Sequence, residues 1–153
     1  MACRFLLGEV DALPSQRAIT RVQLARMLRP LTAPERFGPV PADTTDPAAC
    51  EAAANGFFPL DDRSCFGPER TLTRQEMATV AMQACGVNYR NAGSTMPVCT
   101  DVGGVANNYG TNVARALYFG FMELEDGAFH PLRTVTVREA AEIVNRMADF
   151  AEL

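Results

Sequence analysis

The chain has 153 residues, of which 48% are hydrophobic and 21% charged, as in an ordinary folded domain or a small array of repeats. No apolar run approaches the roughly 20 residues of a membrane-spanning helix, and the formal net charge of −4 argues against non-specific binding to nucleic acid. All 14 basic residues are arginine, which suits bidentate recognition of planar anions, although genome composition also produces such a bias.

The first part of the chain predicts one short helix followed by a connector. Residues 1–12 have the pattern of the tail of a helix that runs into Gly8. Thr20 is expected to cap a helix that Pro30 ends, because proline disfavours helix in the residue before it. Residues 30–45 contain four prolines and a glycine, which is typical of a connecting segment.

The middle of the chain predicts two helices joined by an irregular loop. Asp46 is a good N-cap, and Pro47 suits the first helical position. This helix is expected to end at Gly56, because glycine readily adopts the conformation that follows a helix. A second helix is expected to begin after Thr73 and to end at Gly86.

The last part predicts two more helices. Residues 88–109 are a polar connector rich in glycine and asparagine. A helix is expected over residues 111–119, ending at Gly120, and Asp126-Gly127 is expected to form a turn in the next loop. Thr136 is expected to cap the last helix. Because no segment shows the alternation of a β-strand, the sequence predicts an all-α fold.

Three of these helix starts share one pattern, a threonine followed three residues later by Glu or Gln. In such a capping box the threonine hydroxyl and the second side chain each accept a hydrogen bond from the other residue's backbone N–H. The pairs are Thr20 with Gln23, Thr73 with Glu76, and Thr136 with Glu139. One box is common, but three boxes that each open an apolar helix indicate a repeat.

The predicted unit consists of a helix, a glycine, a loop with a Phe-x-Pro motif, a threonine cap and a second helix. The Phe-x-Pro motifs stand at the same distance before their threonines, as Phe66-Gly67-Pro68 and Phe129-His130-Pro131. We expect three units, at residues 1–32, 40–86 and 98–153, which together form one compact domain. The first unit lacks most of its first helix.

These units resemble the S-layer homology domain, which typically occurs in threes. The family pattern has a starting Asp, a helix, a Gly-aliphatic turn, Asp-Gly-Thr-Phe-x-Pro, and Ile-Thr-Arg-x-Glu before a second helix. The matching residues are Asp43 and Asp101 at the start, Gly56-Phe57 and Gly120-Phe121 at the turn, Asp126 to Pro131 and, loosely, Arg63 to Pro68 in the loop, and Thr20-Arg21, Thr73-Arg74-Gln75-Glu76 and Thr136-Val137-Arg138-Glu139 in the signature. The resemblance covers nearly the whole chain.

The resemblance implies three helix-loop-helix units around a pseudo-threefold axis, and a non-catalytic module that anchors surface proteins to acidic cell-wall glycans, often pyruvylated ones. It also implies ligand-binding residues in the grooves between units. They are Arg74, Arg21, Asp43, Asp101, Gly56, Gly120, Thr73 and Glu76. The chain departs from the family by having no tryptophan, by Val137 in place of the third signature arginine, and by Gln23 in place of the first signature glutamate.

The signature arginines have a physical interpretation of their own. Arg21 and Arg74 occupy first helical positions, where the helix dipole disfavours a positive charge. Their placement predicts an external anion, although a solvated side chain or an ion pair with Asp43 or Asp101 explains it equally well. Since only Thr73-Arg74-Gln75-Glu76 is a complete signature, the Arg74 groove is expected to be the best ligand site.

The cysteines and acidic residues allow further expectations. Local disulfides Cys50–Cys65 and Cys85–Cys99 are candidates in an oxidising compartment, and buried free thiols are the alternative. With a single histidine and no Cys-x-x-Cys pair, no structural metal site is expected. Acidic loop residues such as Asp61 and Asp62 are expected to be solvated, so neither catalysis nor a cofactor is predicted.

The sequence is therefore consistent with two candidate functions. The first is an extracellular, cell-surface module that binds cell-wall polysaccharide. The second is a structural or protein–protein interaction subunit of a surface layer or filament, favoured by the missing tryptophan, by Val137 and by the unpaired Cys3. The apolar segment before Glu9 is too short for a signal peptide, and we expect the chain to be a fragment of an exported protein rather than cytosolic.

Overall fold

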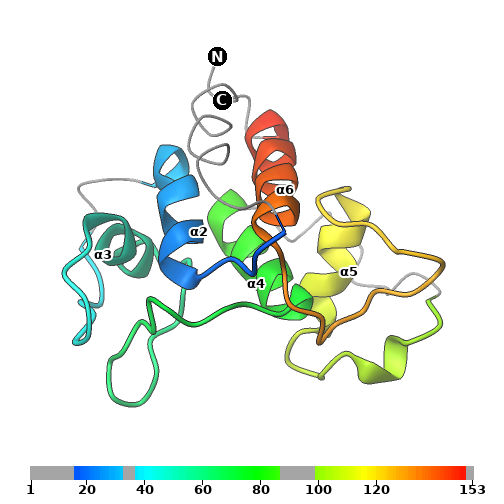
Figure 1. Cartoon of the computed structure of the whole chain (residues 1–153), viewed down its shortest axis with the longest axis horizontal. Coiled ribbons are helices and arrows are strands. Elements are labelled where there is room, and N and C mark those ends of the chain that lie inside the picture. Colours follow the sequence, from blue (N-terminus) through cyan, green and yellow to red (C-terminus); the bar gives the residue numbers. More distant parts are fainter. Residues whose placement is uncertain (1–15, 33–36, 87–98, 151–153) are drawn as a thin grey trace.

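Five α-helices and two short 3₁₀ helices form the regular structure of the described residues (Figure 1). The computed structural model describes residues 16–32, 37–86 and 99–150. The elements in chain order are α2 (Arg21–Met27), η1 (Arg29–Leu31), α3 (Pro47–Ala54), α4 (Arg74–Cys85), η3 (Val102–Gly104), α5 (Gly110–Tyr118) and α6 (Val137–Phe150). Within these ranges the only β-type pairings are isolated bridges, which confirms the helical class. The helix predicted over residues 1–12 lies outside the described residues.

The helix starts follow the predicted capping chemistry with one exception. The Thr20 hydroxyl accepts from Gln23 N–H at 3.3 Å, and the Gln23 side chain accepts from Thr20 N–H at 2.9 Å. Thr73 and Glu76 make the same reciprocal pair, at 3.4 and 3.1 Å. Two predicted capping boxes are thereby confirmed.

The third box is only half formed. Glu139 N–H donates to the Thr136 hydroxyl at 3.2 Å, as predicted. The Glu139 carboxylate, however, accepts a hydrogen bond from Arg133 at 2.7 Å. The Glu139 side chain therefore pairs with Arg133 instead of capping the Thr136 N–H. The prediction of a complete capping box at α6 is corrected to a threonine cap alone.

The helices pack in pairs along the chain. α3 packs against α2, and α5 packs against α4, while α6 contacts both α4 and α2. The buried residues of α3 are four alanines, Ala48, Ala49, Ala52 and Ala53, whose small side chains allow a close approach to α2. Salt bridges Arg26–Asp46 (2.8 Å) and Arg29–Glu51 (2.9 Å) join the same two helical segments at the surface.

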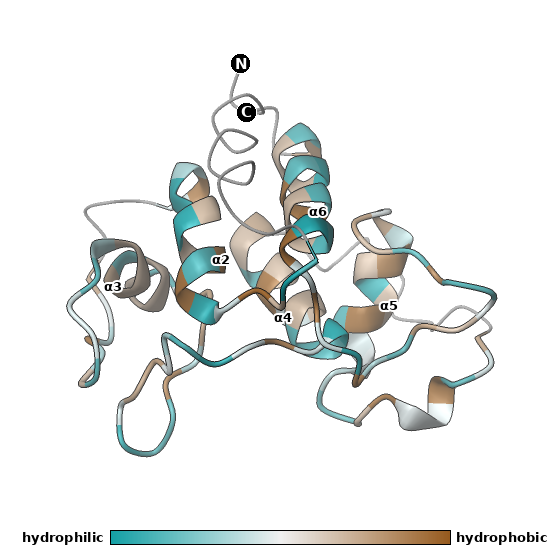
Figure 2. Ribbon diagram, in the orientation of Figure 1, coloured by the Kyte–Doolittle hydropathy of each residue, from teal (hydrophilic) through white to brown (hydrophobic). Residues whose placement is uncertain are grey.

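The core lies between these helices and the loops that precede α4 and α6. Helices α5 and α6 carry apolar and polar residues on different sides (Figure 2), and α6 buries Ile143, Val144 and Met147. Phe66 and Phe129, from the two Phe-x-Pro motifs, are buried to 1% and 0% exposure. The motifs therefore serve as core anchors for otherwise irregular loops.

Backbone hydrogen bonds link the starts of α2, α4 and α6 in a closed cycle. Arg21 N–H donates to Arg70 O at 2.8 Å, and Arg74 N–H donates to Arg133 O at 2.9 Å. Val137 N–H then donates to Arg17 O at 2.8 Å, which returns the cycle to the segment before α2. Each of these helix starts thus obtains an acceptor from the loop that precedes another helix, which satisfies a backbone N–H that the helix itself leaves unpaired.

The length and apolar content that a membrane-spanning helix requires are found in none of the helices within the described ranges.

Candidate functional site

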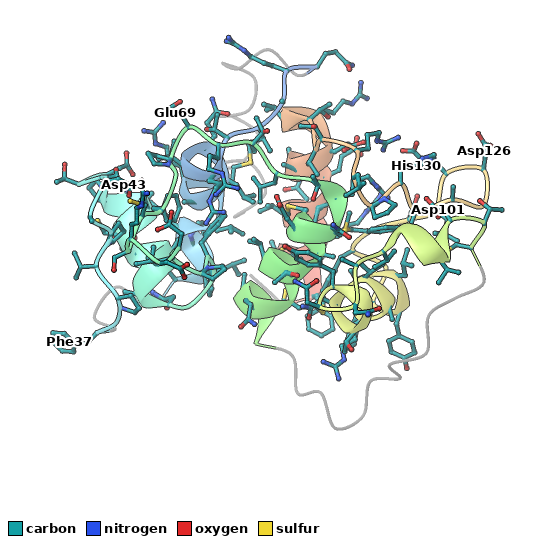
Figure 3. The ribbon with its side chains drawn as sticks, turned by 90° about the horizontal axis from the view of Figure 1, so that it is seen from below. Phe37, Asp43, Glu69, Asp101, Asp126 and His130 are labelled. Atoms are coloured by element: carbon teal, nitrogen blue, oxygen red, sulfur yellow. The ribbon has the colours of Figure 1, made fainter. Side chains whose placement is uncertain are left out.

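Asp43 and Asp101 each hold one Phe-x-Pro loop. The two carboxylate oxygens of Asp43 accept from the N–H groups of Phe66 and Gly67 at 2.7 and 2.9 Å. Those of Asp101 accept from Phe129 and His130 at 2.8 and 2.7 Å. Figure 3 shows Asp101 close to His130, with Asp43 on the other side of the molecule.

These contacts explain the two aspartates without a ligand. The backbone N–H donors lower the pKa of both carboxyl groups, because they stabilise the charged form. Neither aspartate makes the direct ion pair with Arg21 or Arg74 that the sequence allowed; each fixes a loop instead. Ligand binding by Asp43 and Asp101 remains a prediction, but their oxygens are already engaged.

Arg74 is buried and its donors are used inside the protein. Its side chain is only 4% exposed. Nε donates to Phe129 O at 2.7 Å and Nη2 donates to Glu123 O at 2.7 Å, while the guanidinium carbon lies 4.9 Å from the centre of the Phe129 ring. The expectation that Arg74 offers a free bidentate guanidinium to an external carboxylate is therefore not met.

The space beside Arg74 is also unfavourable for an anion. A pocket of about 100 Å³ opens there, and we call it the Arg74 pocket. Its charged lining residues are Arg74, Arg146, Glu123, Glu125, Glu139 and Glu142. The four carboxylates outnumber the two lining arginines, although Arg133 pairs with Glu125 and Glu139, so the lining has no surplus of positive charge to attract an acidic ligand.

Arg21 occupies the corresponding place in the preceding predicted unit and makes fewer internal hydrogen bonds than Arg74. Its Nη2 donates to Pro59 O at 3.2 Å, and its guanidinium carbon lies 5.2 Å from the Phe58 ring and 5.3 Å from the Phe66 ring. Its Nε is buried and has no hydrogen-bond acceptor among the described residues. Cation–π contacts therefore position a guanidinium that keeps an unused donor.

The pocket beside Arg21, which we call the Arg21 pocket, has a volume of about 250 Å³. It is lined by Arg21 and Arg70, by the carboxylates of Asp61 and Glu76, by Tyr109, and by apolar residues that include Phe58, Leu72 and Val80. These residues come from all three predicted units. Burial and then the neighbouring Arg70 lower the pKa of Arg21, because both disfavour its positive charge. An anionic group bound here would relieve that repulsion.

The remaining predicted residues have structural roles. Thr73 and Glu76 form the capping box of α4, although Glu76 also lines the Arg21 pocket. Gly56 and Gly120 both have positive φ at the ends of α3 and α5, as predicted for helix ends. Neither glycine lines the Arg21 or Arg74 pocket.

The third helix start has no arginine in the equivalent place. Val137 is 1% exposed and belongs to the core. Arg138 lies one position further round the helix, where it pairs with Glu142 across 3.4 Å at the surface. This side chain therefore does not replace the missing signature arginine.

The four cysteines proposed for disulfides are free thiols in the structure. The thiol of Cys50 donates to Thr44 O at 3.8 Å, whereas that of Cys65 donates to Arg63 O at 3.7 Å. Burial raises the pKa of Cys85 to about 11. The bridges Cys50–Cys65 and Cys85–Cys99 are thus absent from the structure, and the thiols of Cys50 and Cys65 face backbone carbonyls instead.

Two lining residues of the Arg21 pocket were not singled out from the sequence. Arg70 lies just before the signature, and Tyr109 lies at the N-cap of α5. Tyr109 could not be placed because residues 88–109 carry only connector signals. Arg70 had a usable signal, since Arg133 occupies the same position before Thr136.

Within the described ranges, no group of three or more His, Cys, Asp or Glu side chains is placed to hold a metal ion. The Arg21 pocket instead offers two arginines, two carboxylates, the aromatic rings of Phe58 and Tyr109, and apolar walls. This combination suits a small anionic ligand with an apolar face.

Comparison of the sequence with known proteins adds no assignment. No protein-family model matches the chain, and no curated protein matches it.

Proposed function

We propose that the chain is a non-catalytic anchoring module that binds an acidic glycan of a cell wall in the Arg21 pocket. The observation that carries this proposal is the pair of arginines, Arg21 and Arg70, which line one pocket together with aromatic and apolar side chains. A carboxylate on a sugar would accept from such donors in charge-assisted hydrogen bonds. The extracellular, cell-surface location belongs to the same proposal.

A pseudo-threefold arrangement of three helical units is part of the proposal. The closed cycle of hydrogen bonds from Arg21 to Arg70, from Arg74 to Arg133 and from Val137 to Arg17 supports it. The matched carboxylate contacts of Asp43 and Asp101 support equivalent second and third units. The resemblance to S-layer homology triplets rests on these repeated contacts as well as on the motifs.

The size and lining of the Arg21 pocket suit one sugar residue of a polymer. Its volume of about 250 Å³ is near the lower end of ligand pockets, which span about 300–1,000 Å³. Phe58, Val80 and Tyr109 supply apolar and aromatic surface that can cover the faces of a pyranose ring. The pocket opens to solvent, so the rest of a polymer can extend away from the bound sugar.

Co-sedimentation with purified wall polysaccharide tests the proposal. The full chain should bind an acidic wall polymer, and Arg21→Gln should weaken that binding about tenfold or more, the effect of losing a hydrogen bond to a charged group. Arg138→Gln is the matched control, since Arg138 lies at a helix start but pairs at the surface with Glu142. Absence of binding by the folded wild-type chain, or equal losses in both variants, would count against the proposal.

A separate observation favours the second candidate, a protein–protein interaction subunit. Phe37 is fully exposed and Val40 is 77% exposed, and Phe37 projects from the edge of the molecule (Figure 3). Exposed aromatic residues are enriched at protein interfaces. Light scattering at increasing concentration should reveal assembly that Phe37→Ser abolishes, whereas a strict monomer would exclude this candidate.

A further inference from the structure

Arg70 shares the Arg21 pocket but lies outside the repeated Thr-Arg signature. Its carbonyl accepts the hydrogen bond from Arg21 N–H at 2.8 Å, which fixes the Arg70 backbone beside the start of α2. The aliphatic part of its side chain lies close to Gly67, since a Cβ built on Gly67 would stand 2.7 Å from Arg70 Cδ. The loop therefore sets the position of Arg70, and Arg70 is one of the residues that line the pocket.

In the third predicted unit, the positive charge of the equivalent residue, Arg133, is balanced by internal carboxylate partners. Its two terminal nitrogens donate to both carboxylate oxygens of Glu125, and Nη2 also donates to Glu139 at 2.7 Å. The Arg133 hydrogen bonds lower the pKa of Glu125 to about 2, as a close ion pair requires. Arg133 is thus neutralised within its own loop.

Arg70 does not form the corresponding ion pairs. The two carboxylates in the matching positions, those of Asp61 and Glu76, accept backbone hydrogen bonds instead. Asp61, which corresponds to Glu125, accepts from the N–H groups of Arg63 and Cys65 at 2.8 and 2.9 Å. Glu76, which corresponds to Glu139, accepts from Thr73 N–H in the capping box. In the part of the chain that the structure describes, no ion pair involves the Arg70 side chain.

The Arg21 pocket and the Arg74 pocket also differ in one lining residue, which comes from α4 in the first and from α6 in the second. Thr79 of α4 lines the Arg21 pocket, and the corresponding residue of α6, Glu142, lines the Arg74 pocket. The Thr79 hydroxyl accepts from Asn112 at 3.1 Å and adds no charge. The Arg21 pocket therefore keeps an unpaired arginine and lacks a carboxylate at this position.

We infer that Arg70 is the residue that pairs with the carboxylate of the bound sugar and makes the pocket selective for acidic over neutral ligands. This inference rests on the proposed function and deepens it. Arg21, held on two phenylalanine rings, can donate a hydrogen bond to the carboxylate from a fixed position, whereas Arg70 is free to form a bidentate pair with it. The chain should accordingly bind one carboxylated sugar per molecule, because Arg133 is closed to this role.

The recognised chemistry is a carboxylate attached to a pyranose ring. It has two sources, a hexuronic acid, with the carboxylate on C5, and a pyruvate ketal, with the carboxylate on an added ring. The defined probes are methyl glucuronoside, a methyl hexoside carrying a 4,6-pyruvate ketal, and neutral methyl glucoside. Titration calorimetry of the full chain at low ionic strength would measure each affinity and the stoichiometry.

Four variants separate the possibilities. Arg70→Gln should weaken binding of the carboxylated probe by about tenfold or more, and Arg70→Lys should retain part of the affinity. Thr79→Glu, which copies Glu142, should weaken binding to a similar degree without altering either arginine. Arg133→Gln, the matched control, should change the affinity less than about twofold. Circular dichroism establishes that each variant is folded.

The outcomes distinguish this inference from the proposed function. Equal effects of Arg70→Gln and Arg133→Gln, unchanged binding in Arg70→Gln, or equal affinity for the neutral glucoside would overturn it. A chain that binds wall polymer but neither carboxylated probe also overturns it, while the proposed anchoring function stands. A chain that binds neither polymer nor probes contradicts both. The stronger of the two carboxylated probes identifies the source of the acid group.

Discussion

Arg74 and Phe129 are joined twice, through a 2.7 Å hydrogen bond from Arg74 Nε to the Phe129 carbonyl and through the guanidinium carbon 4.9 Å from the Phe129 ring centre. The two residues belong to different predicted units, and the pair ties the start of α4 to the loop before α6. The arginine of a repeated sequence motif is here part of the core. This relationship makes a prediction about stability rather than binding.

Arg74→Ala should lower the free energy of unfolding by about 2–4 kcal/mol, because two carbonyls lose charged donors at a buried position. Urea unfolding followed by circular dichroism would measure the change. Arg138→Ala, which removes an exposed ion pair, should change it by less than about 0.5 kcal/mol. A variant Arg74→Ala as stable as the wild-type chain would show that the buried contacts contribute little.

The loop aspartates predict a dependence of stability on pH. Hydrogen bonds from backbone N–H groups lower the pKa of Asp43 and Asp101 in the folded chain. Their contribution is therefore fully present above the unfolded carboxyl pKa of about 3.9, and it is lost as the pH falls through the lower folded value. Urea midpoints measured from about pH 6 down to pH 2 should decrease over this window.

Asp101→Asn should flatten this dependence and lower the urea midpoint at neutral pH, so that variant and wild type converge in acid. Asp62→Asn is the control, because Asp62 is exposed and makes none of the loop hydrogen bonds. If both substitutions leave the acid transition unchanged, the loop contacts do not govern acid stability.

In the turn before Phe129, position 127 is predicted to accept glycine better than any other residue. Asp126 and Gly127 both have positive φ, 49° and 79°, and Glu125 and Ala128 exchange two backbone hydrogen bonds across them. Gly127→Ala should lower the free energy of unfolding by about 1–2 kcal/mol, because an L-residue is strained in this conformation. Thermal denaturation would measure the loss.

Gly103→Ala provides the comparison for this turn. A Cβ at Gly103 would meet no atom within 4 Å, so its stability change should stay within about 0.5 kcal/mol. Equal tolerance at both positions would contradict the two-residue turn.

The buried thiol of Cys85 is predicted to react slowly with alkylating reagents. Burial raises the pKa of Cys85 to about 11, so its thiolate is scarce at neutral pH. Alkylation of the native, reduced chain by iodoacetamide, followed by mass spectrometry of the peptides, should modify Cys85 slowly and at a rate that increases with pH. Rapid modification of Cys85 at neutral pH, or a bridged Cys85–Cys99 peptide, would contradict the free and shielded thiol.

Local chemistry was readable from the sequence, whereas long-range partners were not. Thr73 with Glu76 and Asp46 with Pro47 predict helix starts because the interacting atoms lie within one turn. The direction of Arg74 depends on carbonyls of residues 123 and 129, which the chain brings back from a distant loop. No local pattern contains that information.

In the candidate site, too, the local features could be predicted from the sequence and the long-range partners could not. The sequence identified Arg21 and Arg74 as equivalent, and both do lie over a phenylalanine of a Phe-x-Pro motif. Their difference arises from residues around them, since Arg133 meets Glu125 and Glu139 whereas Arg70 meets neither Asp61 nor Glu76. The motif therefore predicts the position of a pocket, and neighbouring charges decide whether it can accept an anion.

The closed cycle of backbone hydrogen bonds has a consequence for how the chain folds. In a linear solenoid each added module contacts only its neighbours, so folding can spread from any point and the number of modules can vary. Here the bond from Val137 to Arg17 requires the last helix to meet the first segment. The two ends of the long segment between these residues must therefore meet before the structure is complete, which favours all-or-none folding. The same bond fixes the number of helical units that the closed arrangement can hold.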